Sequence, residues 1–87
     1  MKEYRIDFSD VQGKQEAHER IALVLSFPDY YGKNLDALYD CLREIPPCTI
    51  RLYHLDVLGH YGEIIHRVFL DAAKDRAGRL ETILEND

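Results

Sequence analysis

Apolar and polar positions alternate with two different periods along this chain, and each change of period marks a new element. Residues 2–8 alternate at every second position, with Tyr4 and Ile6 apolar between charged neighbours, which indicates a β-strand. Residues 14–25 instead place their apolar side chains at helical spacing, and Pro28 prevents that helix from continuing. The chain is therefore predicted to open with a strand followed by a helix.

The middle of the chain is predicted to contain a second helix and then a second strand. Asn34 is a suitable N-cap for a helix over residues 34–45, and Pro46 and Pro47 end that helix. Residues 49–54 are rich in β-branched and aromatic side chains, which favour a second strand.

The last third of the chain is predicted to contain one long helix and one strand. Gly59 and Gly62 flank a predicted turn, residues 63–76 carry an apolar stripe at helical spacing, and Gly78 is suited to end that helix. Residues 80–84 then form a third strand. Strands separated by helices are joined by crossovers, so the predicted fold class is α/β, a three-stranded parallel sheet with helices packed against it.

Composition narrows the classes of function. Sixteen Asp and Glu residues against eleven Lys and Arg give a net charge of −5, which disfavours direct binding to nucleic acid or to an anionic membrane. The start of the chain is charged where a signal peptide is apolar, and no window approaches the ~20 apolar residues of a membrane span. We therefore expect a cytoplasmic protein with a single domain over residues 1–87.

The residue types that usually carry catalysis or bind metals form no recognisable set in this sequence. No zinc-like spacing joins the histidines and cysteines, which are His18, His54, His60, His66, Cys41 and Cys48. The two serines are not in a nucleophile-elbow context, and a glycine-rich phosphate loop is missing. We expect free thiols, no metal and no cofactor.

The helix predicted over residues 34–45 carries acids on the face opposite its leucines. At 100° per residue, Asp36, Asp40 and Glu44 form one stripe on that face. Carboxylates one turn apart repel each other by a few tenths of a kcal/mol, and Arg43 is placed to pair with Asp40. The positive end of the helix dipole favours Asp36 in the first turn. Taken alone, this stripe is better explained as an ordinary solvated surface.

Three tyrosines change that interpretation. Tyr30 and Tyr31 lie in the preceding turn, where a buried ring is not expected, and Gly32 permits a positive φ there. Tyr39 lies at the boundary of the apolar face, with its hydroxyl able to reach water. Aromatic rings beside charges are typical of a protein-binding surface. Asp71, on the later helix, is placed to extend the same negative surface.

The stretch PDYYGKNLDALYDCL, residues 28–42, closely resembles the central motif of the barstar family, the intracellular inhibitors of secreted microbial ribonucleases. The likeness is dense over the paired tyrosines, the Gly-x-Asn turn and the Leu-Asp-Ala-Leu-aromatic-Asp-Cys run, and it is looser along nearly all of the remaining chain. It implies a three-stranded parallel sheet with helices packed beside it, in agreement with the periodicity. It also implies a protein that occludes a ribonuclease active site and is not an enzyme.

The resemblance further implies a role for each site residue. Asp40 would enter the catalytic cleft, Asp36 would pair at its rim, and Asp71 replaces a family glutamate that adds an ion pair. The remaining partner contacts would come from Tyr30, Tyr31, Gly32, Asn34 and Tyr39. A tryptophan is usual in the family where this chain has Tyr39. Because family members carry a proline just before the second strand, we also expect a cis bond before Pro47.

Three hypotheses of function follow. The first is an inhibitor of a basic microbial ribonuclease, monomeric when free and 1:1 in the complex, acting as an immunity protein or antitoxin. The second keeps the fold but gives it another cationic protein partner, such as a toxin nuclease of a different type or a regulator. The third is a hydrolase that uses Asp36 and Asp40 as an acid/base pair, which the convex helix face and the lack of a nearby histidine disfavour.

Overall fold

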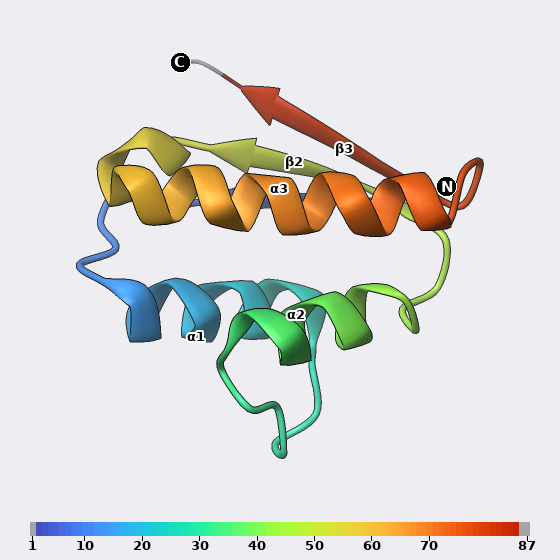
Figure 1. Ribbon diagram of the computed structural model, residues 1–87, viewed down its shortest axis with the longest axis horizontal. Helices are drawn as coiled ribbons and strands as arrows, with labels where there is room; N and C mark the ends of the chain where they lie inside the picture. Colours follow the sequence, from blue (N-terminus) through green and yellow to red (C-terminus); the bar gives the residue numbers. More distant parts are fainter. Residues whose placement is uncertain (1, 86–87) are drawn as a thin grey trace.

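Strands and helices alternate along the chain in the computed structural model, which describes residues 2–85 (Figure 1). The elements follow in the order β1 (Lys2–Asp7), α1 (Lys14–Leu25), α2 (Leu35–Leu42), β2 (Cys48–Tyr53), the 3-10 helix η1 (Leu55–Leu58), α3 (His60–Asp75) and β3 (Leu80–Glu85). The predicted α/β fold with a parallel three-stranded sheet is confirmed.

The sheet has β2 at its centre and is covered by helices on one face. Its strand order is β1-β2-β3, and both pairings are parallel. Along β2 every second side chain is buried, which is the pattern of a strand with one face towards a core. On the other face, Arg51 pairs with Glu3 of β1 at 2.9 Å and with Glu85 of β3 at 2.6 Å, so its guanidinium links all three strands.

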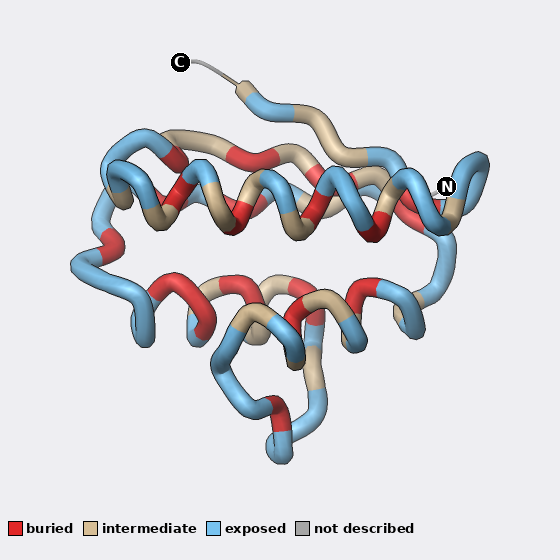
Figure 2. The backbone as a smooth tube through the Cα atoms, in the orientation of Figure 1, coloured by how far each residue is buried: buried red, intermediate tan, exposed pale blue. Residues whose placement is uncertain are grey.

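The hydrophobic core lies between this sheet and the helices. Figure 2 shows that the buried positions of α1 and α3 lie on the sides that face each other. Ile6, Ile50 and Leu52 of the sheet meet Ile21 of α1 and Phe69 of α3 in this core, and all five are fully buried. The apolar stripes of the helices cover the same face of the sheet. This packing explains why the apolar residues recur at helical spacing in the sequence.

The prediction for α1 is confirmed, but α2 ends three residues earlier than expected. Ile45 precedes a proline and is therefore disfavoured from helical geometry. The last turn tightens, since the Glu44 amide donates to Cys41 O at 3.0 Å, three residues back. The carbonyl of Leu42, left without a helical partner, accepts a hydrogen bond at 2.8 Å from Nη1 of Arg76, the C-cap residue of α3.

The prediction of a turn flanked by Gly59 and Gly62 is wrong at its second residue. Gly62 lies inside α3, which begins at His60, and η1 occupies part of the preceding connection. A Cβ at Gly62 would lie 2.3 Å from the carbonyl oxygen of Leu55, so only glycine allows η1 to approach the helix this closely.

The structure tests several predictions about the connections between the strands and helices. No cis peptide bond occurs within residues 2–85, so the predicted cis bond before Pro47 is wrong. β2 begins at Cys48, one residue earlier than predicted, and ends before His54, which takes a left-handed conformation at φ 59°. Gly78 has a φ of 84°, but the C-cap of α3 is Arg76, two residues earlier, so the predicted role of Gly78 in ending that helix is wrong. Cys41 and Cys48 are free thiols, as expected.

Candidate protein-binding site

The acidic side chains predicted to form a stripe on α2 are exposed, and they form no salt bridge with the described residues of the protein. Asp36, Asp40 and Glu44 are all exposed, and Glu44 lies in the turn just after the helix. None of the three takes part in a salt bridge among the residues that the structure describes. The predicted pairing of Arg43 with Asp40 is absent from this set, because the guanidinium lies over the Tyr39 ring, 5.6 Å from its centroid.

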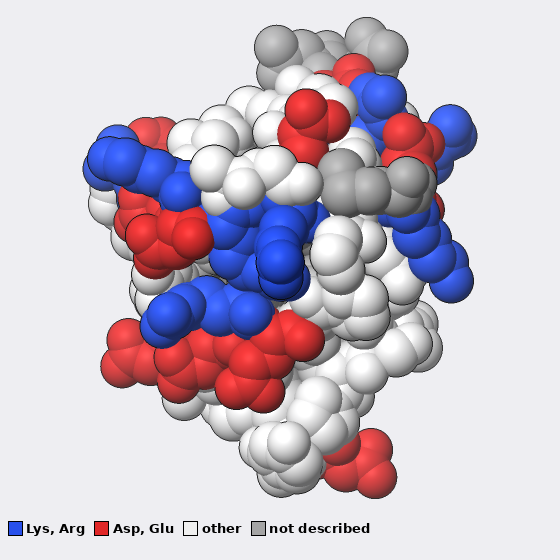
Figure 3. All heavy atoms as spheres, turned by 90° about the vertical axis from the view of Figure 1, so that its right-hand side faces the viewer, with Lys and Arg blue, Asp and Glu red and all other residues white. Residues whose placement is uncertain are grey.

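The surface of the molecule is not uniformly negative. Figure 3, which views the molecule from the right-hand side of Figure 1, shows acidic groups at the left separated by bands of Lys and Arg. Asp71 and Asp75 are exposed on α3, one helical turn apart. Acidic side chains on this face are thus grouped into patches, and each patch presents its own local field to a partner.

The three tyrosines of the motif occupy three different environments. Tyr30 is 86% exposed, Tyr39 is partly buried against the core, and Tyr31 is only 7% exposed. The expectation that Tyr31 is exposed in its turn is therefore wrong. Its ring packs edge-on against Phe27 with centroids 4.9 Å apart, and burial raises the pKa of its phenol well above the ordinary value.

The loop of residues 28–34 is held to both neighbouring helices. The amide of Tyr31 donates to Pro28 O at 3.0 Å, which closes a turn around the exposed Tyr30. Lys33 forms an ion pair with Glu19 of α1 at 3.3 Å. At the other end, Asn34 Oδ1 accepts from the Ala37 amide at 2.8 Å, which confirms the predicted N-cap of α2.

The positive φ in this loop belongs to Lys33 and not to Gly32 as predicted. Lys33 has a φ of 53°, whereas Gly32 is outside the positive-φ region. Gly32 is instead confined by Asn34, whose Nδ2 donates to Gly32 O at 3.3 Å and would lie 3.1 Å from an added Cβ. A small residue here allows the Asn34 side chain to keep its capping geometry.

A groove of about 670 Å³ lies between this loop and α2. Its lining includes the aromatic rings of Tyr4, Phe27 and Tyr30 together with the carboxylates of Asp40 and Glu44. Aromatic faces and carboxylates both attract cations, so the groove has the chemistry to receive a Lys, Arg or protonated His side chain. Asp36 does not line the groove, and the two carboxylates of the hydrolase hypothesis therefore do not converge on one space.

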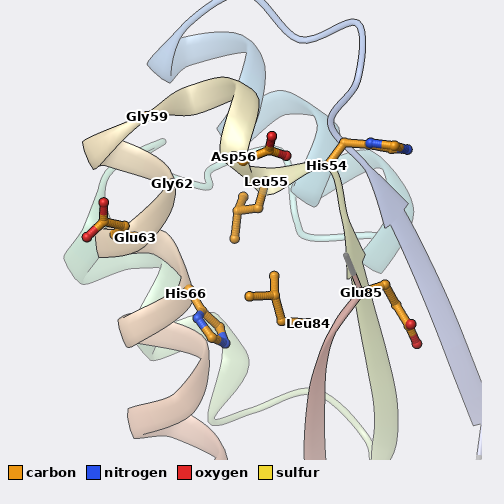
Figure 4. A pocket seen from close by; sticks show the side chains of 9 residues that line it. All are labelled: His54, Leu55, Asp56, Gly59, Gly62, Glu63, His66, Leu84 and Glu85. Carbon is orange, nitrogen blue, oxygen red and sulfur yellow. The ribbon is translucent and has the colours of Figure 1, made fainter. Parts of the chain in front are cut away.

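A second hollow, of about 450 Å³, lies at the end of β2 and β3 beside the start of α3 (Figure 4). Leu55, Leu84 and the ring of His66 point towards its interior, while His54 and Glu63 point away. Burial, with a smaller contribution from Arg67, lowers the pKa of His66. Within residues 2–85, no group of three or more His, Cys, Asp or Glu residues is arranged to hold a metal ion.

Two residues that the structure ties to this site, His18 and Tyr61, were not predicted to belong to it. His18 of α1 is 1% exposed, and its Nδ1 lies 2.6 Å from the Tyr31 hydroxyl, while its Nε2 lies 2.7 Å from the hydroxyl of Tyr61 on α3. His18 precedes the apolar Ile21 by three positions and Leu25 by seven. That placement on the apolar face of α1 was the available signal for a buried histidine.

Comparisons with known proteins bear on the function of this site. A protein-family model described as "Barstar (barnase inhibitor)" matches residues 1–84. A Bacillus subtilis (strain 168) protein named "Putative ribonuclease inhibitor YrdF" is 33% identical over 91 residues, which cover 98% of this chain and 100% of that protein.

Proposed function

This chain belongs to the barstar family, and from that premise we propose that it inhibits a basic microbial ribonuclease by occluding the enzyme's cationic active site with α2 and the loop of residues 28–34. The family match and the similarity to a protein named as a ribonuclease inhibitor both support a ribonuclease-inhibitor role. Family members are inhibitors and not enzymes, which confirms the prediction that this protein is not an enzyme.

The observation that carries the proposal is the set of unpaired carboxylates on α2 and the turn that follows it. Asp36, Asp40 and Glu44 are exposed and lack ion-pair partners among the described residues. In water their mutual repulsion is small, whereas opposite a cationic cleft from which water is excluded each carboxylate gains a strong, charge-assisted contact. An exposed Tyr30 beside them adds the type of rigid aromatic contact that carries much of the free energy in protein interfaces.

The residue roles in this proposal follow the family resemblance with one change. Asp40, which lines the groove, would meet the basic residues of the enzyme's cleft, and Asp36 would pair at the rim. Tyr39 and Asn34 would border these contacts, and Asp71 would add an ion pair from α3. Gly32 would allow close approach of the partner. The buried Tyr31 would contribute as the support of the loop from below.

We further propose a 1:1 complex, a monomer when free, and a cytoplasmic location, with self-protection against a ribonuclease as the physiological role. Among residues 2–85, no helix is both long and apolar enough to cross a membrane. Neither nucleic acid nor a cofactor is part of the proposal, since the net charge of −5 favours a cationic protein as the direct partner.

Titration against a panel of basic microbial ribonucleases tests the proposal. Cleavage of a fluorogenic RNA should fall linearly to zero at one equivalent of the protein, and size-exclusion chromatography should show a 1:1 complex. An Asp40→Asn variant, which keeps the shape of the side chain but removes its charge, should inhibit far less at the same concentration.

The second hypothesis, another cationic protein partner for the same surface, makes a different prediction in this assay. It predicts no inhibition and no complex with any ribonuclease in the panel. A pull-down with the wild-type protein and the Asp40→Asn variant as matched baits would then identify the partner as the protein retained by the first bait alone.

A further inference from the structure

A buried hydrogen-bonded chain joins three separate elements beneath the proposed binding loop. The imidazole of His18, on α1, lies between the hydroxyl groups of Tyr31 in the loop and Tyr61 in the first turn of α3. The separations are 2.6 Å and 2.7 Å, and both rings are 5.9 Å from the imidazole between centroids. Through these two bonds, His18 of α1 joins the loop to α3.

The donor and acceptor capacity of a neutral imidazole fits this chain in one arrangement. One ring nitrogen carries a hydrogen and donates, while the other accepts. Tyr31 is buried and its hydroxyl hydrogen has no other partner among the described residues, so it must donate to His18 Nδ1. His18 Nε2–H then donates to the hydroxyl oxygen of Tyr61, whose partly exposed position leaves its own hydrogen free to reach water.

Few charged groups approach this imidazole. Tyr31 from the loop and Tyr61 from α3 are its hydrogen-bond partners, and Lys14 of α1 lies over the far ring of Tyr61, 5.0 Å from the centroid. The Glu19 carboxylate on α1 is exposed and is engaged by Lys33. Burial alone lowers the pKa of His18, without a contribution from any neighbouring charge.

We propose that His18 is a positioning residue for the binding loop of residues 28–34: by holding the Tyr31 hydroxyl it fixes the turn that presents Tyr30 and leads into α2. This inference rests on the proposed function of that loop. Tyr30 is the residue next to Tyr31 and is 86% exposed, so its placement depends on the anchored backbone beside it. A loop fixed before binding avoids the entropic cost of ordering it in the complex.

Protonation of His18 reverses its hydrogen bond with Tyr31. The imidazolium has two N–H donors and no acceptor, so Nδ1–H donates to the Tyr31 oxygen and the Tyr31 hydroxyl hydrogen loses its acceptor. A hydroxyl hydrogen inside the core would then have no partner, which is costly. The loop is therefore expected to loosen, and inhibition to weaken, as the pH falls below the ordinary histidine pKa of about 6.5.

Four variants separate the positioning role from general stability. Tyr31→Phe keeps the ring and removes only the hydroxyl. His18→Asn places its amide near the position of Nδ1, and His18→Gln places its amide near that of Nε2, so the first can keep the Tyr31 bond and the second the Tyr61 bond. Tyr61→Phe removes the other hydroxyl on the same imidazole and serves as the matched control.

The first measurement is amide hydrogen exchange of the free protein. Tyr31→Phe and His18→Gln should raise exchange within residues 28–34 while the sheet keeps its protection, and His18→Asn and Tyr61→Phe should change this loop much less. Uniformly faster exchange along the chain, or loop exchange in Tyr31→Phe equal to that of the wild type, would overturn the proposal. This measurement needs no partner, so it remains decisive if no ribonuclease is inhibited.

The second measurement is inhibition as a function of pH. Tyr31→Phe should inhibit about tenfold less than the wild type at pH 8, the loss expected for one buried hydrogen bond. That ratio should shrink as the pH falls below about 6.5, because protonation of His18 deprives the same hydroxyl hydrogen of its acceptor in the wild type, while any titration of the enzyme is common to both proteins. A ratio that is constant with pH, or an equal loss in Tyr61→Phe, would show that His18 does not position the loop.

Discussion

At the scale of single residues, acids of the same charge differ in how fully a partner can enclose them. Asp40 lies in mid-helix on α2 and lines the groove, whereas Asp75 is at the exposed end of α3. Asp40→Ala should weaken binding to the ribonuclease by roughly 2–5 kcal/mol, because a buried cation of the enzyme would lose its partner. Asp75→Ala should cost about 0.2–1 kcal/mol, as for other water-screened charges.

Isothermal titration calorimetry of the two variants checks this difference, and urea unfolding provides the control. The free Asp40→Ala protein should be as stable as the wild type or slightly more so, since the change relieves repulsion with Asp36 and Glu44. Equal binding losses for the two variants would exclude α2 as the docking surface.

How well a residue's environment could be predicted depended on how far away its partners are in sequence. The cap formed by Asn34 was predictable because its donor, the Ala37 amide, is three residues away. Tyr30 and Tyr31 are neighbours in the same turn, yet one is 86% and the other 7% exposed. Tyr31 packs against Phe27 and bonds to His18 on another helix, and this second contact is not contained in any local pattern around the two tyrosines.

At the scale of elements, α2 depends on its cap more than a longer helix would. It has eight residues, and isolated helices of this length are unstable in water. Asn34→Ala removes the acceptor for the Ala37 amide and should lower the free energy of unfolding by about 0.5–2 kcal/mol. Asn34→Asp, which keeps an acceptor in place, should recover most of this loss. Urea unfolding of the three proteins measures it, and an Asn34→Ala protein as stable as the wild type would contradict it.

Element boundaries were predicted correctly where a local residue such as proline ends the element. They were predicted wrongly where contacts with distant residues determine the boundary. The bounds of α1 were predicted from its spacing and from Pro28. The start of α3 was misjudged because Gly62 was read as part of a turn, although its role is to admit the Leu55 carbonyl. That carbonyl is a tertiary neighbour, and a glycine chosen for close approach has the same appearance in a sequence as one chosen for a turn.

At the scale of the whole molecule, two imidazoles link stability to pH, the buried one of His18 and the half-buried one of His66. The pKa values of His18 and His66 are both lowered, mainly by burial. In the unfolded chain these groups take up protons near a pKa of about 6.5, so below that pH the unfolded state binds more protons than the folded state. Stability should be complete above about pH 6.5 and fall as the pH drops below it. Urea midpoints measured from pH 8 to 5 check this, and a midpoint that rises on acidification would contradict it.

The net charge of −5 governs the rate of encounter with a basic partner. Attraction between the two proteins extends over a Debye length of ~8 Å at physiological ionic strength and shortens as salt is added. Stopped-flow association should therefore slow steadily with rising NaCl, while the dissociation rate changes much less. A salt-independent association rate would argue against a cationic partner.

The overall topology was the most predictable feature, since helices between strands require parallel crossovers whatever the details of packing. The charge pattern of the assembled surface was not predictable in the same way. Figure 3 shows bands of basic side chains between acidic ones on the assembled surface.

The parallel sheet also determines how the molecule responds to stretching. Because all three strands run in the same direction, Lys2 at the start of β1 and Glu85 at the end of β3 lie at opposite ends of the sheet. Force applied between these residues shears the strands along their length, so the interstrand hydrogen bonds and the ion pairs of Arg51 bear the load together. Force between Asp7 and Glu85, at the same end of the sheet, would instead peel the outer strands away one bond at a time. Optical-trap measurements should find a higher unfolding force for the first pair of attachment points than for the second.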